Sequence, residues 1–143
     1  MSKADELRLL RDAAATFARR GGIERSRALR ATRPGMDAAV WTQMAEQGWL
    51  GILIPEEFGG QGLGFGEMAV VVEELAKTLS PEPVVASSVL SASLLLAGDN
   101  DALKRALLAK IATGESVVGA TVLAVRSCWR APRCRRPRCC AVA

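Results

Sequence analysis

Two adjacent carboxylates, Glu56 and Glu57, are the first residues of this chain whose type and spacing suggest acid–base chemistry. They follow Pro55 in a glycine-rich stretch, where two acids could share the work of proton transfer. Neighbouring side chains in a turn point in different directions, however, and the chain contains no histidine to assist them. We therefore interpret the pair as solvated loop carboxylates and assign no catalytic residue.

A glycine pattern at residues 64–69, GFGEMA, has the spacing of a dinucleotide-binding turn and precedes a helical stretch. The apolar run before it ends at Pro55, too early for the tight strand-to-helix turn of such a site. Glu67 would also place negative charge where a pyrophosphate should bind. We interpret the pattern as a structural loop, and the cofactor-binding residues stay unassigned.

All four cysteines fall in residues 126–143, together with six arginines and no acidic residue. The cysteines are Cys128, Cys134, Cys139 and Cys140, and the arginines are Arg126, Arg130, Arg133, Arg135, Arg136 and Arg138. The cysteine spacing lacks the short paired intervals of common zinc sites, and no histidine could complete a ligand set. The sequence therefore predicts no metal site.

Three explanations fit the composition of this tail. The arginines and Trp129 could contact the phosphates and bases of a nucleic acid, or the tail could bind an anionic surface in another way. A GC-rich coding sequence translated in the wrong frame also yields arginine, proline, alanine and cysteine. We favour this last explanation, because regular apolar spacing is lost where the composition changes, and nucleic acid is not the expected partner.

Charge is unevenly distributed along the 143 residues. The net charge is +4, but residues 1–125 carry 13 basic and 15 acidic side chains, so the body of the chain is slightly acidic. Half of the residues are apolar, which is typical of one soluble domain with a single core. The N-terminus lacks the apolar stretch of a secretory signal, and the apolar run at 84–97 is too short to span a membrane. We expect a cytoplasmic protein.

Apolar residues recur at helical spacing along most of the chain before residue 115, which predicts an all-α fold of about five helices. The apolar side of the first helix comprises Leu7, Leu10, Ala14, Phe17 and Ala18. We expect Gly21 and Gly22 to end this helix. Asp37 can cap the second helix, which carries Trp41 and Met44 on one side, and Gly48 closes it.

Three further helices are predicted downstream. An apolar pattern from Met68 to Leu79 gives the third, which the sequence SPEP at 80–83 breaks. A buried helix covers roughly 84–97. The last helix has Asp99, Asn100 and Asp101 as cap candidates and ends at Thr113 and Gly114.

The remaining segments have a different character. Residues 49–66 contain six glycines and one proline, which predicts a long loop with several left-handed backbone positions. Residues 116–125 are rich in valine and little charged, so they could begin a strand.

The segments WTQMAEQGWLGILIPEEFGG at 41–60, QGLGFGEMAVVVEELAKTLSP at 61–81 and LLLAGDNDALKRALLAKIATGE at 94–115 occur in this order. Together they resemble the N-terminal helical domain of acyl-CoA dehydrogenases, over residues 5 to about 120. The resemblance implies a helical domain at 1–120. The Arg/Cys-rich tail at 121–143 falls outside it, and its composition predicts a disordered segment.

The resemblance also implies a chemistry. Acyl-CoA dehydrogenases use FAD to convert acyl-CoA thioesters to trans-2-enoyl-CoA, with a catalytic glutamate that removes the α proton. In that family the flavin lies between a middle β domain and a C-terminal helical bundle, which supplies the base. Neither is found in this sequence, so we expect a truncated chain that is inactive alone and binds FAD at most weakly. The alternative is a non-catalytic helical subunit that joins complete dehydrogenase subunits in a homo- or hetero-oligomer.

The tail is expected to lack a stable fold, because it offers no regular apolar face and its arginines repel one another. Amide hydrogen exchange on the reduced, metal-free protein tests this. We expect residues 130–140 to exchange freely, and slow exchange across them would show that the tail packs as a real element.

Overall fold

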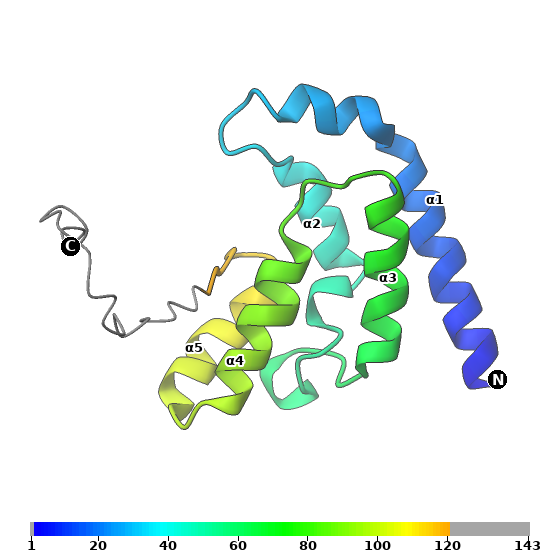
Figure 1. Cartoon of the computed structure of the whole chain (residues 1–143). Helices are drawn as coiled ribbons and strands as arrows, with labels where there is room; N and C mark the ends of the chain where they lie inside the picture. Colours follow the sequence, from blue (N-terminus) through cyan, green and yellow to red (C-terminus); the bar gives the residue numbers. More distant parts are fainter. Residues whose placement is uncertain (1, 121–143) are drawn as a thin grey trace, which may run out of the picture.

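The computed structural model describes residues 2–120, and these form an all-α domain, as the sequence predicted (Figure 1). Its α-helices are α1 (Lys3–Leu29), α2 (Ala38–Glu46), α3 (Phe65–Lys77), α4 (Ala92–Ala97) and α5 (Asp101–Ala112). Two 3₁₀ turns, η1 (Trp49–Gly51) and η2 (Glu56–Phe58), lie in the glycine-rich loop, and a π-helix, η3 (Val85–Ser91), leads into α4. The tail at 121–143, including its cysteines and arginines, lies outside the described residues.

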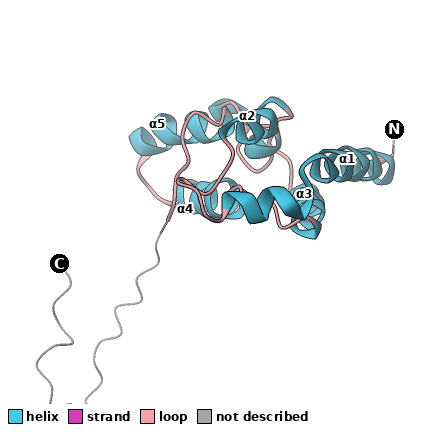
Figure 2. Ribbon diagram, turned by 90° about the horizontal axis from the view of Figure 1, so that it is seen from above, coloured by secondary structure: helices cyan, strands magenta, loops and turns pink. Residues whose placement is uncertain are grey.

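The helices form two layers. Seen from above, α2 and α5 lie in one layer and α3 and α4 in the other, with α1 at the edge beside α3 (Figure 2). The larger core cluster is built around Trp41, Met44, Leu50 and Val71, and Phe17 of α1 packs edge-on against Trp49 with ring centroids 5.0 Å apart. A second cluster, centred on Leu108 and Ile111 of α5, joins α5 to α4 and the loop.

Helix α1 differs from the prediction, because it does not end at Gly21 and Gly22. The chain breaks helical geometry only at Gly22, where φ is 56° and ψ is −174°, and a second helical segment continues to Leu29. Glycine tolerates this left-handed φ without the steric penalty that a side chain would bring. The glycines therefore mark a kink within the helix.

The helix caps follow the sequence closely. The Asp37 carboxylate accepts a hydrogen bond from the Ala39 backbone N–H at 2.9 Å, at the start of α2. The Asn100 side chain accepts one from the Leu103 N–H at 3.0 Å, at the start of α5. Both caps satisfy amides that would otherwise lack a partner.

The glycine-rich loop folds back on itself through backbone hydrogen bonds. The N–H groups of Gln61, Gly62 and Leu63 donate to the carbonyls of Gly51, Ile54 and Ile52 at 2.9, 2.8 and 2.8 Å, respectively. Gly60 lies so close to the opposite segment that a Cβ there would sit 2.0 Å from the Ile54 carbonyl oxygen. The loop is thus a packed hairpin-like element, and Gly59 and Gly62 take the left-handed conformations that the sequence predicted.

The helix predicted at 84–97 is present, but its first half has π-helical hydrogen bonding. The Ala92 N–H reaches back five residues to the Ser87 carbonyl. The Ser91 hydroxyl oxygen lies 2.7 Å from the Ala86 carbonyl oxygen, also five residues back, and 2.9 Å from the Val118 carbonyl oxygen, so the two carbonyls share its single proton. Bulges of this kind widen a helix and often occur at functional sites.

The strand expected from residue 116 does not appear within the described part of it, residues 116–120. This segment instead attaches to η3. The Val118 N–H donates to the Ser87 hydroxyl at 3.2 Å, while the Trp41 indole N–H holds the preceding turn through the Gly114 carbonyl at 3.0 Å. Residues 121–125 of the expected strand lie outside the described residues.

Replacing Gly60 with alanine should disrupt the loop. The new methyl group meets backbone on the opposite segment, so we expect the free energy of unfolding to fall by roughly 2–3 kcal/mol. Urea denaturation measures this. Gly66→Ala is the matched control, because Gly66 is exposed on α3 with no atom within 4 Å of the point that a Cβ would occupy, and it should be neutral or slightly stabilising. Equal stability of the two variants would contradict the packed-loop description.

Candidate functional site

An apolar cleft of about 310 Å³ opens between the C-terminal half of α3 and the start of η3. Its lining residues are Val72, Leu75, Ala76, Ser80, Glu82, Pro83, Val84, Val85 and Ala86. Most of these side chains are aliphatic, so the cleft suits a hydrocarbon group more than a polar or charged one.

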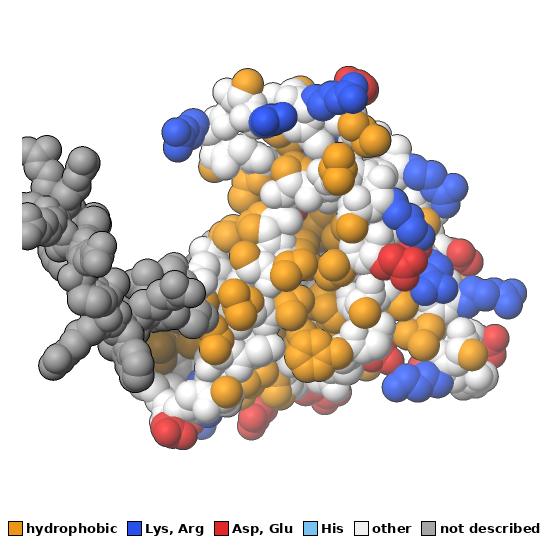
Figure 3. Space-filling model, in the orientation of Figure 1, with side chains coloured by type: hydrophobic (Ala, Val, Ile, Leu, Met, Phe, Trp, Pro, Cys, Tyr) orange, Lys and Arg blue, Asp and Glu red, His pale blue; other side chains and the backbone are white. Residues whose placement is uncertain are grey.

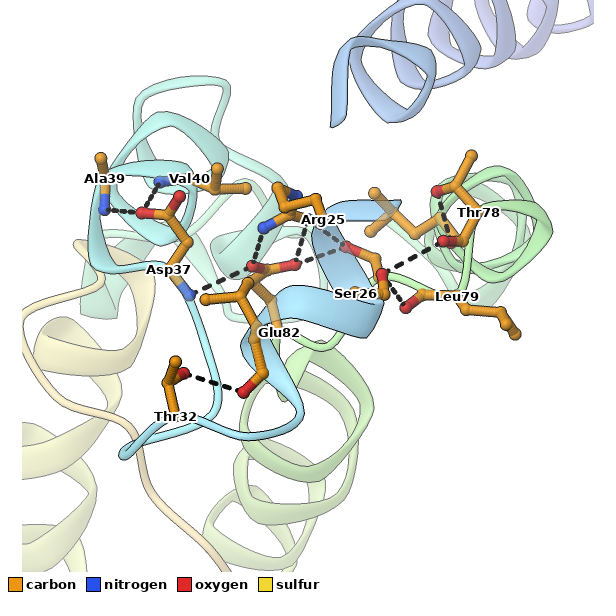
Figure 4. A network of polar contacts seen from close by, with 12 residues as sticks. Arg25, Ser26, Thr32, Asp37, Ala39, Val40, Thr78, Leu79 and Glu82 are labelled. Carbon is orange, nitrogen blue, oxygen red and sulfur yellow. Dashed lines mark hydrogen bonds and ion pairs between the residues drawn. The ribbon is translucent and has the colours of Figure 1, made fainter. Parts of the chain in front are cut away.

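Glu82, the one ionisable residue of this lining, is fully buried and paired. Its side chain has 0% exposure, and the Arg25 guanidinium donates to its two oxygens at 2.6 and 2.9 Å (Figure 4). The Ser80 hydroxyl and the Asp37 backbone N–H also donate to it. Because each carboxylate oxygen has two donors, Glu82 has little capacity left for a ligand.

The second segment of α1 is held over this pair. The Ser26 hydroxyl lies 2.7 Å from the Leu79 carbonyl and 3.3 Å from the Thr78 carbonyl. Leu79 itself has a φ of 54°, in the left-handed region that a leucine rarely adopts. Arg25 and Ser26 therefore fix the chain beyond the Gly22 kink against the end of α3 (Figure 4).

The ion pair shifts the pKa of both partners. Burial alone would raise the pKa of Glu82, but hydrogen bonds from Arg25 and Ser80 outweigh it and hold that pKa below its ordinary value. The hydrogen bond to Glu82 raises the pKa of Arg25. The pair is consequently charged throughout the neutral pH range.

The carboxylates singled out in the sequence lie elsewhere. Glu56 and Glu57 are exposed on η2 and do not line the cleft. Glu67 bonds to the Gly64 N–H at 3.0 Å and to Lys3 at 3.3 Å. The Glu67 carboxylate thus occupies the N-terminus of α3, where a dinucleotide phosphate would bind, which favours the structural interpretation of the glycine pattern.

Sequence reasoning missed Arg25 and Glu82. The pattern at 80–83 indicates only a helix break, and Arg25 lies just beyond Gly21 and Gly22, where the first helix was expected to end. The available signal is one acidic residue between two prolines, directly before an apolar run. Its partner lies 57 residues away, so no local pattern identifies it.

The face around the cleft is strongly apolar. Figure 3 shows apolar side chains gathered over α3, η3 and α4, while most of the basic side chains in this view lie towards α1. Large apolar residues exposed on these elements are Phe65, Val85, Leu90 and Leu94, with exposures from 41 to 65%. Exposed apolar surface of this kind commonly marks a site of protein or ligand contact.

Metal and membrane sites are not evident in the described residues. No three histidine, cysteine, aspartate or glutamate side chains within residues 2–120 are grouped closely enough to hold a metal ion. In the same range, no helix has both the length and the apolar character needed to cross a bilayer.

These features define an all-helical domain with an apolar cleft beside a kinked N-terminal helix. The sequence pattern of the acyl-CoA dehydrogenase N-terminal domain matches residues 4–115. The chain belongs to this family.

Two curated relatives show how much of a dehydrogenase the chain represents. It is 35% identical over 125 residues to acyl-CoA dehydrogenase IpdE2 of Mycobacterium tuberculosis, which covers 86% of this chain but 38% of the relative. It is 45% identical over 73 residues to (2S)-methylsuccinyl-CoA dehydrogenase of Cereibacter sphaeroides, covering 50% of this chain and 13% of the relative. The chain therefore spans well under half the length of these relatives.

Solved structures show the same fold. A variant of the Tcur3481-Tcur3483 steroid ACAD superposes with a TM-score of 0.72 and 28% identity, over 82% of this chain and 32% of that one. The ChsE4-ChsE5 complex from Mycobacterium tuberculosis also gives a TM-score of 0.72, over 83% of this chain and 32% of that one, at 23% identity. The latter likeness concerns the fold alone.

The buried pair should make stability depend on pH. The folded Glu82 carboxyl has a lowered pKa, so the unfolded state binds its proton more readily, and stability falls as pH drops through the folded pKa. The contribution of the ionised Glu82 carboxylate to the free energy of unfolding is fully present above the ordinary glutamate pKa of about 4.3. Glu82→Gln should lower the free energy of unfolding by about 3 kcal/mol at neutral pH, because it leaves Arg25 unpaired.

Denaturation of the wild type and Glu82→Gln between pH 3 and 7 measures this contribution. The stability gap between the two proteins should shrink as pH falls. Glu57→Gln is the control, because Glu57 is exposed and away from the cleft, and it should follow the wild type. A gap that stays constant with pH would show that the charge of Glu82 does not matter.

Proposed function

We propose that this chain supplies the N-terminal helical wall of an FAD-dependent acyl-CoA dehydrogenase, and that its apolar cleft receives part of the aliphatic group of an acyl-CoA. The observation that carries this is the aliphatic cleft between α3 and η3, in a domain of this family. The family reaction converts an acyl-CoA thioester to trans-2-enoyl-CoA, with FAD as the oxidant. A cleft lined mainly by aliphatic side chains suits the hydrocarbon part of such a substrate.

The described residues do not themselves fit the flavin cofactor. A dinucleotide phosphate needs free backbone N–H groups, usually at a helix N-terminus. Here the N-termini of α1, α2, α3 and α5 are capped by the side chains of Ser2, Asp37, Glu67 and Asn100. The π-helix η3 has no side-chain cap, but it begins three residues after Glu82, whose negative charge disfavours a phosphate there. No step of the reaction is therefore assigned to this chain, and no catalytic residue is proposed within residues 1–120.

Assembly with other subunits is the second part of the proposal. The apolar face over α3, η3 and α4 offers a surface for further dehydrogenase polypeptide, in a homo- or hetero-oligomer. In this alternative the chain is a non-catalytic helical partner in the cytoplasm.

The isolated chain should neither retain FAD nor oxidise acyl-CoA. Tight flavin binding needs many oriented donors, and catalysis needs a carboxylate aligned with the substrate α carbon. The purified protein is saturated with FAD, freed of excess, and assayed for acyl-CoA-dependent reduction of an electron-transfer dye. We expect a colourless, inactive protein.

A complete relative such as IpdE2, treated in the same way, controls for the assay. A yellow chain carrying stoichiometric FAD and turning over substrate would overturn the view that the chain is one wall of a larger site.

In sedimentation, the chain alone should self-associate through its exposed apolar face.

A further inference from the structure

A second cleft adjoins the apolar one at Ser80, which lines both. It measures about 150 Å³ and is lined by α1 and α2, including Phe17, Ala18, Gly21, Val40 and Gln43. We call it the α1–α2 cleft. Ser80 lines both clefts, Arg25 lines the α1–α2 cleft, and Glu82 lines the apolar cleft. The hydrogen-bonded group Arg25–Ser80–Glu82 therefore separates the two spaces.

We propose that this group is a polar partition that sets the inner limit of the apolar cleft, and with it the length of the aliphatic group that the cleft accepts. This specificity role rests on the proposed function of the cleft. We call Arg25, Ser80 and Glu82 together the polar partition.

The partition has the properties of a rigid end wall. The Glu82 carboxylate is fully buried and the Arg25 guanidinium is 22% exposed. Separating the two groups would therefore leave an unpaired charge in an apolar environment. Both oxygens of Glu82 are already engaged, by Arg25, Ser80 and the Asp37 backbone. A hydrocarbon chain that reaches the polar partition can extend further only by separating Arg25 from Glu82, which is energetically unfavourable.

Gly21 gives the guanidinium the room it needs. A Cβ at this position would come within 2.5 Å of Arg25 Nε and 2.9 Å of Arg25 Cδ. The absent side chain of Gly21 therefore lets Arg25 lie across the boundary and reach Glu82. A methyl group there would displace Arg25 without changing any charge.

The chemistry of the two clefts defines the ligand class on each side. The apolar cleft is lined mainly by aliphatic side chains. The α1–α2 cleft also has apolar walls from Phe17, Ala18 and Val40, and the exposed Arg20 and Gln43 complete its lining. Without the partition, the two clefts would form one longer path with mainly apolar walls. The partition thus selects for uncharged aliphatic groups that end before Ser80.

The proposal is tested by titrating the full chain with octanoate, dodecanoate or hexadecanoate. The affinity of each fatty acid is measured from NMR chemical-shift changes. Affinity should rise about four-fold for each methylene that the cleft buries, and then stop rising once the chain reaches the partition. In the double variant Arg25→Ala with Glu82→Ala, which removes the wall without leaving a lone charge, affinity should keep rising to longer chains.

Two further variants make the test specific. Gly21→Ala keeps every charge and should move the limit in the same direction, so the test stands even if the double variant fails to fold. Adding Gln43→Trp to either opened protein fills the α1–α2 cleft and should restore the wild-type limit.

The outcomes separate the two proposals. If wild type shows a length limit that none of the opened variants moves, the partition is wrong while the apolar cleft stands as a ligand site. If neither wild type nor the opened variants bind any of the three fatty acids, both the cleft as a ligand site and the partition are overturned.

Discussion

The buried carboxylate of Glu82 is the constraint on which the arrangement of this domain depends. A charge removed from water must be paired and hydrogen-bonded, and the partners come from three separate segments. Arg25 lies in the second segment of α1, Ser80 lies in the connector after α3, and the Asp37 backbone lies at the start of α2. Satisfying one carboxylate therefore fixes the relative positions of α1, α2 and the helix that follows at Val85.

The local features of the fold were accessible from the sequence. Helical spacing indicated the five α-helices, Asp37 and Asn100 are the caps they were expected to be, and the glycine-rich loop has left-handed positions. Each of these depends on residues within a few positions of one another. The family followed from the order of three segments, and the match over residues 4–115 confirms it.

The features that the sequence did not reveal depend on distant contacts. Gly22 kinks α1 instead of ending it, because Arg25 and Ser26 find partners more than 50 residues away. The π-helical turn of η3 accompanies a contact between Ser91 and Val118. The cleft likewise depends on the distance between two helices, which no spacing rule gives. Neither Glu56 nor Glu57, the carboxylates most visible in the sequence, lines it.

The attachment of residue 118 to η3 gives the domain a mechanical property. Ser87 and Ser91, both buried, hold the Val118 backbone through its N–H and its carbonyl. The same turn carries Val85 and Ala86 into the wall of the apolar cleft. A force on residues 116–120 would therefore be transmitted through Ser87 and Ser91 to η3. Because η3 forms part of the cleft wall, the width of the apolar cleft is mechanically coupled to the position of this segment.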